Sequence, residues 1–237
     1  KEQELPDGDF PTVSYPNPES KEAFELAVKM GNEINADILL ATDPDADRLG
    51  VYVRDDKTGE YHVLTGNMSG CLLAEYEISQ MKEAGQLPDD AALIKTIVTT
   101  NLANDIAKYY NVRLIEVLTG FKYIGEQILN FETTKKGHYA FGFEESYGCL
   151  IGTHARDKDA AYYKTKGMSL WDKMIEMYER YGYWSDGVQS ITLKGKEGIE
   201  KIKNTIEKLR ENVPTEIAGY KVLSARDYKL DTVKNME

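Results

Sequence analysis

The sequence predicts an α/β protein with mixed, mainly parallel sheets, organised as two successive domains and the beginning of a third. Between residues 91 and 143, short runs of strand-forming residues alternate with segments of helical periodicity, which favours a parallel sheet covered by helices. A Thr-Gly-Asn run at residues 65–67 separates this part from an earlier one, and the pattern changes again after Gly187. We therefore place the domains at residues 1–66, 67–187 and 188–237.

The first domain should contain one helix and three strands. Asn17-Pro18 is typical of a helix start, with an N-cap residue followed by proline at the first helical position. Apolar residues at helical spacing continue this helix to about residue 35. The expected strands are residues 37–41, 49–54 and 61–64. A Lys57-Thr58-Gly59 turn indicates that the last two strands form a hairpin.

The second domain should begin with a helix that ends at Gly85. Its expected strands are residues 93–98, 113–117 and 139–143, and the helices between them are residues 102–110 and 123–131. A longer helical region over 158–181 carries an apolar stripe, which we assign to the hydrophobic core rather than to a cofactor site. The stripe consists of Leu170, Met174, Met177 and Tyr178. The third unit should contain a strand at 188–193, a helix at 198–210 and a strand at 220–223.

Composition excludes several classes of protein. A net charge of −11 argues against nucleic-acid binding, because phosphate contacts need a basic surface. Two cysteines, Cys71 and Cys149, are too few for a disulfide framework and fit a reducing, cytoplasmic location. No apolar run reaches the length of a membrane span, so we expect no membrane partner. The sequence begins without Met, and we interpret it as a fragment of a longer protein.

The loop Asp43-Pro44-Asp45-Ala46-Asp47-Arg48 carries the clearest chemical signal. It places three carboxylates at alternate positions between two expected strands, and these would repel one another unless a cation lay between them. Hard oxygen ligands suit Mg²⁺ or Ca²⁺ rather than Zn²⁺. An EF-hand does not fit, because its Gly and Glu positions hold Arg48 and Arg54. A solvated acidic turn remains the alternative.

Three further stretches lie where strands should end. Lys95 is within an apolar strand, where its charge needs an anionic partner unless the strand lies at a sheet edge. Thr119-Gly120-Phe121-Lys122 opens a helix behind a strand and offers a weak anion site. Gly142-Phe143-Glu144-Glu145-Ser146-Tyr147-Gly148 combines acceptors and a donor for the hydroxyls of a polyol, although a polar turn would have the same composition.

Together these motifs resemble the α-D-phosphohexomutase superfamily, and most closely its phosphoglucomutase and phosphopentomutase-like members. Residues 43–48 resemble that family's magnesium loop, 119–122 its specificity loop and 142–148 its sugar-binding loop. The run Arg156-Asp157-Lys158-Asp159-Ala160 resembles the basic segment that follows. The resemblance runs over nearly the whole chain. It implies consecutive three-layer α/β domains with mixed, mainly parallel sheets (the family's domains two and three), plus the start of a C-terminal α+β domain.

The resemblance also implies a role for each candidate residue. Asp43, Asp45 and Asp47 would bind Mg²⁺, whose fourth ligand would be a phosphoserine oxygen. Arg48 and Lys158 would be catalytic, beside the transferring phosphoryl group, and Lys95 would help to position it. Glu144 and Ser146 would hold two sugar hydroxyls, while Glu145 should support the loop rather than contact the sugar. The remaining substrate-binding residues would be Thr119, Gly120 and Lys122.

The implied reaction interconverts hexose 1-phosphate and hexose 6-phosphate through a phosphoserine and a sugar bisphosphate. Glucose 1-phosphate and glucose 6-phosphate are the expected substrates, and a monomer is the expected state. The chain departs from the family because none of its serines lies in a Thr-Ala-Ser-His-Asn-Pro type of loop, and it has no C-terminal Arg-x-Ser-Gly-Thr-Glu-Pro loop. We therefore expect the chain alone to be inactive and to correspond to the middle of a four-domain enzyme.

Other interpretations remain open. The same loops could form a non-catalytic module that binds a metal and a sugar phosphate. The preferred substrate could be a mannose, pentose or amino-sugar phosphate, because the Glu144–Ser146 pair suits hydroxyls that these sugars share. A phosphatase with an aspartate nucleophile is a weaker interpretation, because Asp47 occupies the Thr position of its Asp-x-Asp-x-Thr pattern.

Overall fold

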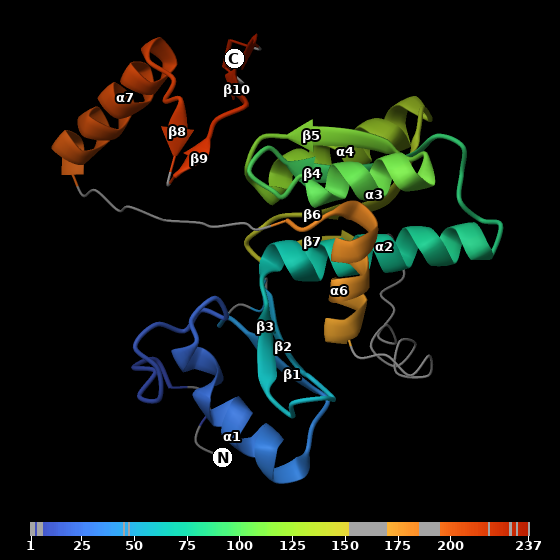
Figure 1. Ribbon diagram of the computed structural model, residues 1–237, viewed down its shortest axis with the longest axis vertical. Helices are drawn as coiled ribbons and strands as arrows, with labels where there is room; N and C mark the ends of the chain where they lie inside the picture. Colours follow the sequence, from blue (N-terminus) through green and yellow to red (C-terminus); the bar gives the residue numbers. More distant parts are fainter. Residues whose placement is uncertain are drawn as a thin grey trace. The chain divides into compact units, whose positions relative to one another are not determined.

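The chain divides into two compact units, Lys1–Asp186 and Gly187–Glu237 (Figure 1). The computed structural model describes residues 3, 7–44, 46, 48–151, 170–184, 195–217, 219–227, 229–230 and 232–236. Each unit is considered by itself.

The first part of unit 1 is a three-stranded antiparallel sheet with a helix on one face. After a short 3₁₀ turn (η1, Glu22–Phe24), helix α1 spans Glu25–Ile34. The strands β1 (Ile38–Thr42), β2 (Leu49–Arg54) and β3 (Tyr61–Leu64) lie in that order. Both pairs are antiparallel, because loops as short as 43–48 and 55–60 cannot make the crossover that parallel pairing needs. The predicted hairpin of β2 and β3 is confirmed.

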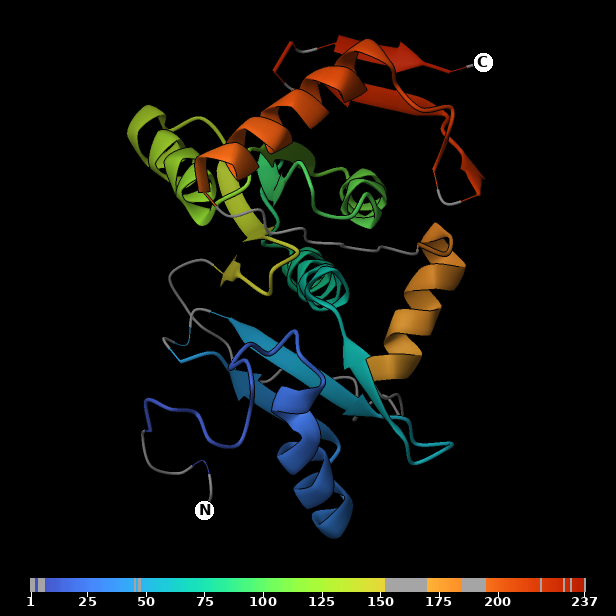
Figure 2. The ribbon, with the colours of Figure 1, turned by 90° about the vertical axis from the view of Figure 1, so that its left-hand side faces the viewer.

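Both faces of this sheet are covered. On one face Phe24, Leu39 and Tyr52 form a small core, and the Phe24 and Tyr52 rings stack with centroids 4.2 Å apart. Figure 2 shows α1 lying along the sheet. On the other face Val53 and Leu64 belong to the larger core of the unit. The turn between β1 and β2, which carries the acidic loop, therefore extends from a sheet that is packed on both sides.

The second part of unit 1 is built around a four-stranded mixed sheet. Helix α2 (Gly66–Glu83) begins after the N-cap Thr65, whose hydroxyl accepts the Met68 N–H at 3.2 Å. In spatial order the strands are β5 (Arg113–Val117), β4 (Ala91–Thr96), β6 (His138–Phe143) and β7 (Cys149–Ile151). β4 is parallel to both of its neighbours, and β7 is antiparallel to β6. The mixed, mainly parallel sheet is confirmed.

Helices cover both faces of this second sheet. α3 (Leu102–Tyr110) and α4 (Phe121–Thr134) connect its parallel strands, and α6 (Leu170–Tyr181) comes later in the chain. Side chains of β4 alternate between the faces: Ala91 and Leu93 join the core that α2, α3 and α6 share, whereas Ala92 and Ile94 join the core under α4. The result is the three-layer arrangement that the family resemblance implied.

The apolar stripe of α6 lies in the larger of these cores. Met174 and Met177 are almost completely buried there, and Leu170 and Tyr178 pack against the same cluster at its margin. The assignment of this stripe to the hydrophobic core is therefore confirmed. The part of the expected helix before Leu170 lies outside the described residues.

In the described part of unit 2, helix α7 (Gly195–Glu211) precedes four short strands. They are β8 (Glu216–Ile217), β9 (Tyr220–Lys221), β10 (Ser224–Asp227) and β11 (Thr232–Asn235), paired antiparallel as β8–β9 and β10–β11. The Arg210 Nε atom lies 2.7 Å from Asp227 Oδ2 and so ties the end of α7 to β10. The strand expected at 220–223 is shorter, since β9 ends at Lys221. The strand expected at 188–193 lies outside the described residues.

The cysteines form no disulfide. Cys71 is buried and Cys149 is exposed, and both are free thiols, as the cysteine count led us to expect. Among the described helices, none has both the length and the apolar character that crossing a membrane would require.

An ion pair at the start of the second sheet gives a pH-dependent prediction. Asp90 contacts the His138 imidazole, and Asp90 Oδ2 accepts the Gly137 N–H at 3.0 Å. The hydrogen bond from His138 is the main reason why the pKa of Asp90 is lowered. The pKa of Asp90 is lower in the folded state than in the unfolded state. The Asp90 carboxylate therefore stabilises the fold at pH values above its ordinary pKa of about 3.9, and this contribution is lost as the pH falls through the folded-state pKa.

Replacing His138 by alanine should raise the pKa of Asp90 toward its ordinary value. Carbon-detected NMR titration of the carboxyl groups measures this directly. Asp55 is the internal control, because its pKa is lowered chiefly by the Lys57 N–H and should not respond to the change at His138. An Asp90 midpoint that stays where it was would contradict the role given to His138.

Candidate functional site

The acidic loop is a tight turn closed by its first and last residues. Asp43 follows β1 directly, and its carbonyl oxygen accepts the Ala46 N–H at 3.0 Å. Ala46 has φ 57°, a left-handed conformation that an alanine adopts only where the surrounding structure requires it. The Asp43 Oδ1 atom accepts the Arg48 N–H at 3.1 Å. This contact fixes the carboxylate at the entrance of the loop.

Arg48 lies between two carboxylates. Its Nε is 3.6 Å from Asp43 Oδ2, and its Nη1 is 3.5 Å from Glu19 Oε1. The arginine side chain is 36% exposed and the Asp43 side chain 11% exposed, so the guanidinium lies at the surface above a partly buried acid. A guanidinium held in this way can also meet an anion that approaches the loop.

The donor set of the loop fits a hard cation. Asp43 accepts the Arg48 N–H in this turn. Asp45 and Asp47 lie outside the described residues. Across the described parts of the chain, no group of three or more His, Cys, Asp or Glu side chains is arranged to hold a metal ion. The three aspartates of the acidic loop are the candidate ligands that the sequence predicts, and carboxylate oxygens suit Mg²⁺.

A hydrogen bond joins the predicted sugar-binding loop (residues 142–148) to the predicted specificity loop (residues 119–122). The Gly120 N–H donates to Glu144 Oε1 at 2.8 Å, although the two residues are 24 positions apart. Glu144 is only 8% exposed, and its own N–H donates to the Gly148 carbonyl at 2.9 Å, which closes the turn. Gly120 has φ 123°, which favours glycine at this position. The structure thus brings together two residues that the sequence placed in separate motifs.

The other predicted residues of these loops lie around this bond. Ser146 is half-buried in the turn that Glu144 closes, and Thr119 is exposed beside Gly120. Lys122 is exposed in the first turn of α4, with its ammonium 4.8 Å from the centroid of the Tyr123 ring. Lys158 lies outside the described residues. The structure therefore describes a carboxylate, two hydroxyls and an exposed ammonium in the loops that follow β5 and β6.

Lys95 is completely buried in the central strand β4. The edge-strand alternative is wrong, because β4 is paired with β5 on one side and β6 on the other. Its ammonium contacts Thr99 O and Asn101 Oδ1, both at 3.0 Å, and Thr100 O at 3.3 Å. It also pairs with Glu116 Oε1 at 3.3 Å across the strands. These contacts offset the cost of burying the charge, and they fix the turn after β4.

Glu145 contacts the turn that follows β4. Its Oε2 lies 3.1 Å from Thr96 Oγ1 and 3.3 Å from Thr99 Oγ1, so its side chain is directed to the end of β4. The next residue of that turn, Thr100, donates its N–H to Asn67 Oδ1 at 3.1 Å. No local sequence pattern marks these threonines or Asn67, because the partners in these contacts lie 33 to 49 positions away.

Glu19 is a further residue that sequence reasoning missed. It contacts Arg48 of the acidic loop, and its charge also reaches Tyr147 of the sugar-binding loop. Burial, followed by the charge of Glu19 and the nearby Tyr52, raises the pKa of Tyr147 to about 12. Glu19 therefore contacts the acidic loop and acts electrostatically on Tyr147.

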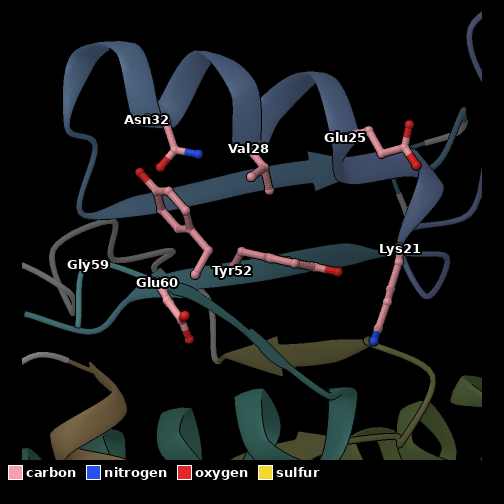
Figure 3. Close-up of a pocket in the computed structure, with 8 residues that line it drawn as sticks. Lys21, Glu25, Val28, Asn32, Tyr52, Gly59 and Glu60 are labelled. Carbon is pink, nitrogen blue, oxygen red and sulfur yellow. The ribbon is translucent and has the colours of Figure 1, made fainter.

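A separate hollow of about 520 Å³ lies beside α1 and the β2–β3 hairpin. Figure 3 shows Val28 and Tyr52 near its centre and the charged ends of Lys21, Glu25 and Glu60 pointing away from one another. Because these charges do not converge, this hollow is a poorer candidate site than the cluster of loops.

Two family models match the chain. The description phosphoglucomutase/phosphomannomutase, alpha/beta/alpha domain III, matches residues 65–189, and the corresponding domain II matches residues 1–59. The chain belongs to the phosphoglucomutase/phosphomannomutase family. This agrees with the resemblance that the four motifs carry.

Curated members of the family are similar over nearly the whole chain. A phosphoglucomutase from Staphylococcus epidermidis is 38% identical over 235 residues, covering 94% of this chain. One from Staphylococcus aureus is 37% identical over 243 residues, covering 98% of this chain. The chain spans 42% and 43% of the lengths of these two relatives.

A solved structure shows the same fold. The exocytosis-sensitive phosphoprotein pp63/parafusin, a phosphoglucomutase from Paramecium in its open form, superposes with a TM-score of 0.56 at 15% identity. The match covers 93% of this chain and 39% of that structure. The phosphoglucomutase/phosphomannomutase family uses a metal ion.

Proposed function

We propose that this chain supplies the metal loop and the sugar-recognition loops of a magnesium-dependent phosphosugar mutase. The intact protein would interconvert hexose 1-phosphate and hexose 6-phosphate through a phosphoserine and a sugar bisphosphate, as an intramolecular phosphotransferase. The observation that carries the proposal is the hydrogen bond between Gly120 and Glu144, which assembles two family motifs into one polar surface. The 38% identity to a phosphoglucomutase supports the reaction class.

The residues of the chain would share the work of binding and charge neutralisation. Arg48 and Lys158 would offset the charge of the transferring phosphoryl group, which is the main requirement of phosphoryl transfer. Asp43, Asp45 and Asp47 would hold Mg²⁺, which when bound supplies additional positive charge to the phosphoryl oxygens. Lys95, through its contacts with residues 99–101, would act on the position of the neighbouring loops.

Recognition of the sugar would depend on the loops at the ends of β5 and β6. Glu144 and Ser146 would hold two hydroxyls, and the same pair can serve a hexose in both of its orientations. The second set of contacts would come from Thr119, Gly120 and Lys122. Glucose 1-phosphate and glucose 6-phosphate are the substrates that the curated relatives favour, while mannose and pentose phosphates are the alternatives.

The domain organisation that accompanies this function is also a proposal. Residues 1–66 and 67–187 would be the second and third domains of the family, and residues 188–237 the beginning of its C-terminal domain. A monomer and a cytoplasmic location remain predictions. A non-catalytic binding module is the second candidate, because no serine of this chain lies in a Thr-Ala-Ser-His-Asn-Pro loop.

Calorimetry with Mg²⁺ and with glucose 6-phosphate tests the binding sites. Asp45→Asn should remove the weak heat of Mg²⁺ binding, and Glu144→Gln should remove sugar-phosphate binding. Asp89→Asn is the matched control, because Asp89 is exposed and lies outside the loops. Equal binding by the wild type, Asp45→Asn and Asp89→Asn would instead support a solvated acidic turn.

A mutase assay separates the two candidate functions. The purified chain should bind the sugar phosphate without converting glucose 1-phosphate to glucose 6-phosphate, because the phosphoserine loop is supplied elsewhere. Measurable conversion by the chain alone would overturn this expectation. Restored conversion after adding the N-terminal and C-terminal parts of a homologous phosphoglucomutase would favour the mutase over a non-catalytic module.

A further inference from the structure

Glu145 is fixed by two buried hydroxyl groups. Its Oε2 lies 3.1 Å from Thr96 Oγ1 and 3.3 Å from Thr99 Oγ1, and the two threonine oxygens are 2.7 Å apart. Thr96 is 0% exposed and Thr99 is 4% exposed. The Glu145 side chain therefore has specific buried hydrogen-bond partners and does not simply extend into solvent.

The number of protons defines the role of the carboxylate. Two hydroxyls carry two protons, but three oxygens lie within hydrogen-bond distance of one another. At most two of the three contacts can therefore be hydrogen bonds at once: either both hydroxyls donate to Glu145, or one hydroxyl donates to the other, which donates to Glu145. In either arrangement the Glu145 carboxylate is an acceptor, and its bond is charge-assisted and stronger than a bond between neutral groups.

The backbone of the same loop is held from a second direction. A Cβ atom at Gly66, the first residue of α2, would lie 2.0 Å from the Glu145 carbonyl oxygen and 2.7 Å from the Tyr147 nitrogen. This contact leaves no room for a side chain at position 66. The loop is thus held by the turn after β4 through the Glu145 side chain and by the start of α2 through its backbone.

Consecutive glutamates are consequently directed to different partners. Glu145 contacts the turn after β4, while Glu144 accepts the Gly120 N–H at the start of α4. We propose that Glu145 is a positioning residue, which holds the loop so that Glu144 is presented to the sugar against Gly120. This inference rests on the proposed function, since it assigns Glu145 a role in preparing the sugar-binding carboxylate rather than in touching the sugar.

Hydrogen exchange of the Gly120 amide tests the proposal. In the wild type this amide should be protected, because it donates to Glu144. Glu145→Ala should speed its exchange by about tenfold and weaken glucose 6-phosphate binding by about tenfold, the effect of losing one hydrogen bond. Glu145→Gln should preserve both, because its amide oxygen can still accept a threonine proton. Unchanged protection in Glu145→Ala, or equal losses in the alanine and glutamine variants, would overturn the proposal.

Adding a methyl group at Gly66 tests the proposal independently. Gly66→Ala should release the same amide, because the added methyl group displaces the loop backbone from the other side. Gly125→Ala is the matched control, since a Cβ atom there meets nothing within 4 Å. Protection of Gly120 that survives Gly66→Ala would count against the proposal. The absence of sugar-phosphate binding in the wild type would refute the proposed function alone, because Gly120 exchange reports on the loop without any ligand.

Discussion

Replacing Glu75 by alanine should lower the free energy of unfolding by about 3–5 kcal/mol, because it removes the buried counter-charge of the buried cation Lys173. Glu75 is on α2 and only 2% exposed. Its Oε1 accepts the Tyr110 hydroxyl at 2.8 Å and lies 3.5 Å from Lys173 Nζ and 3.4 Å from Arg180 Nη1. One carboxylate therefore joins α2, α3 and α6.

The cost is large because the partner of Glu75 is buried as well. Lys173 is 6% exposed, so its ammonium cannot recover full hydration when the carboxylate is removed. Glu176 lies 3.3 Å from Lys173 and 2.6 Å from Arg180, but it is nearer the surface and shared between them. Tyr110 also loses an acceptor. Burial and, after it, the negative charge of Glu75 raise the pKa of Tyr110, so this pKa should fall in the variant.

Urea denaturation followed by tryptophan fluorescence measures this loss. Both tryptophans, Trp171 and Trp184, lie within or just after α6, so the signal reports on the docking of that helix. Glu77→Ala is the matched control on the same helix, and we expect it to change the unfolding free energy by no more than about 0.5 kcal/mol. A loss below about 1 kcal/mol for Glu75→Ala would show that the cluster contributes little.

Several helices and strands were predictable because their apolar residues recur with a clear period and turn residues mark both ends. The bounds of β2, β3, α3 and β5 agree with those expected from the sequence. The expected strand at 93–98 extends two residues too far, because Thr99 donates its N–H to the Thr96 carbonyl and turns the chain. Val98 is 54% exposed as a result, although its β-branched side chain is typical of a strand. Strand β7 is too short for an alternation of apolar and polar residues to identify it in the sequence.

The site was predictable as a set of motifs but not as an arrangement. Each acidic or polar loop was visible because its residues are adjacent in the chain. The spatial order of the strands, β5-β4-β6-β7, was not visible, and it decides which loops become neighbours. Contacts such as Glu145 with Thr96, or Glu19 with Arg48, join residues 49 and 29 positions apart, and no local pattern encodes them.

Gly70→Ala should destabilise unit 1 by about 1–3 kcal/mol, even though alanine is the better helix former. Gly70 lies in α2 against β6, and a Cβ atom there would be 1.9 Å from Cδ2 and 2.5 Å from Cε2 of Phe143. Phe143 is completely buried, so its ring cannot move aside without displacing other core residues. The gain in helix propensity, about 1 kcal/mol, is smaller than the cost of this overlap.

The same substitution should reach the sugar-binding loop, because Phe143 directly precedes Glu144. If the ring moves, the Glu144 carboxylate shifts away from Gly120, and glucose 6-phosphate binding should weaken together with the unfolding free energy. Gly125→Ala separates the gain in helix propensity from the steric overlap. Position 125 is also within a helix, but a Cβ atom there meets nothing within 4 Å. That variant should gain stability, by up to about 1 kcal/mol, with unchanged binding. Equal stabilisation by both variants would mean that α2 and β6 can separate without cost, and the close packing that holds Glu144 in place would have to be abandoned as an explanation.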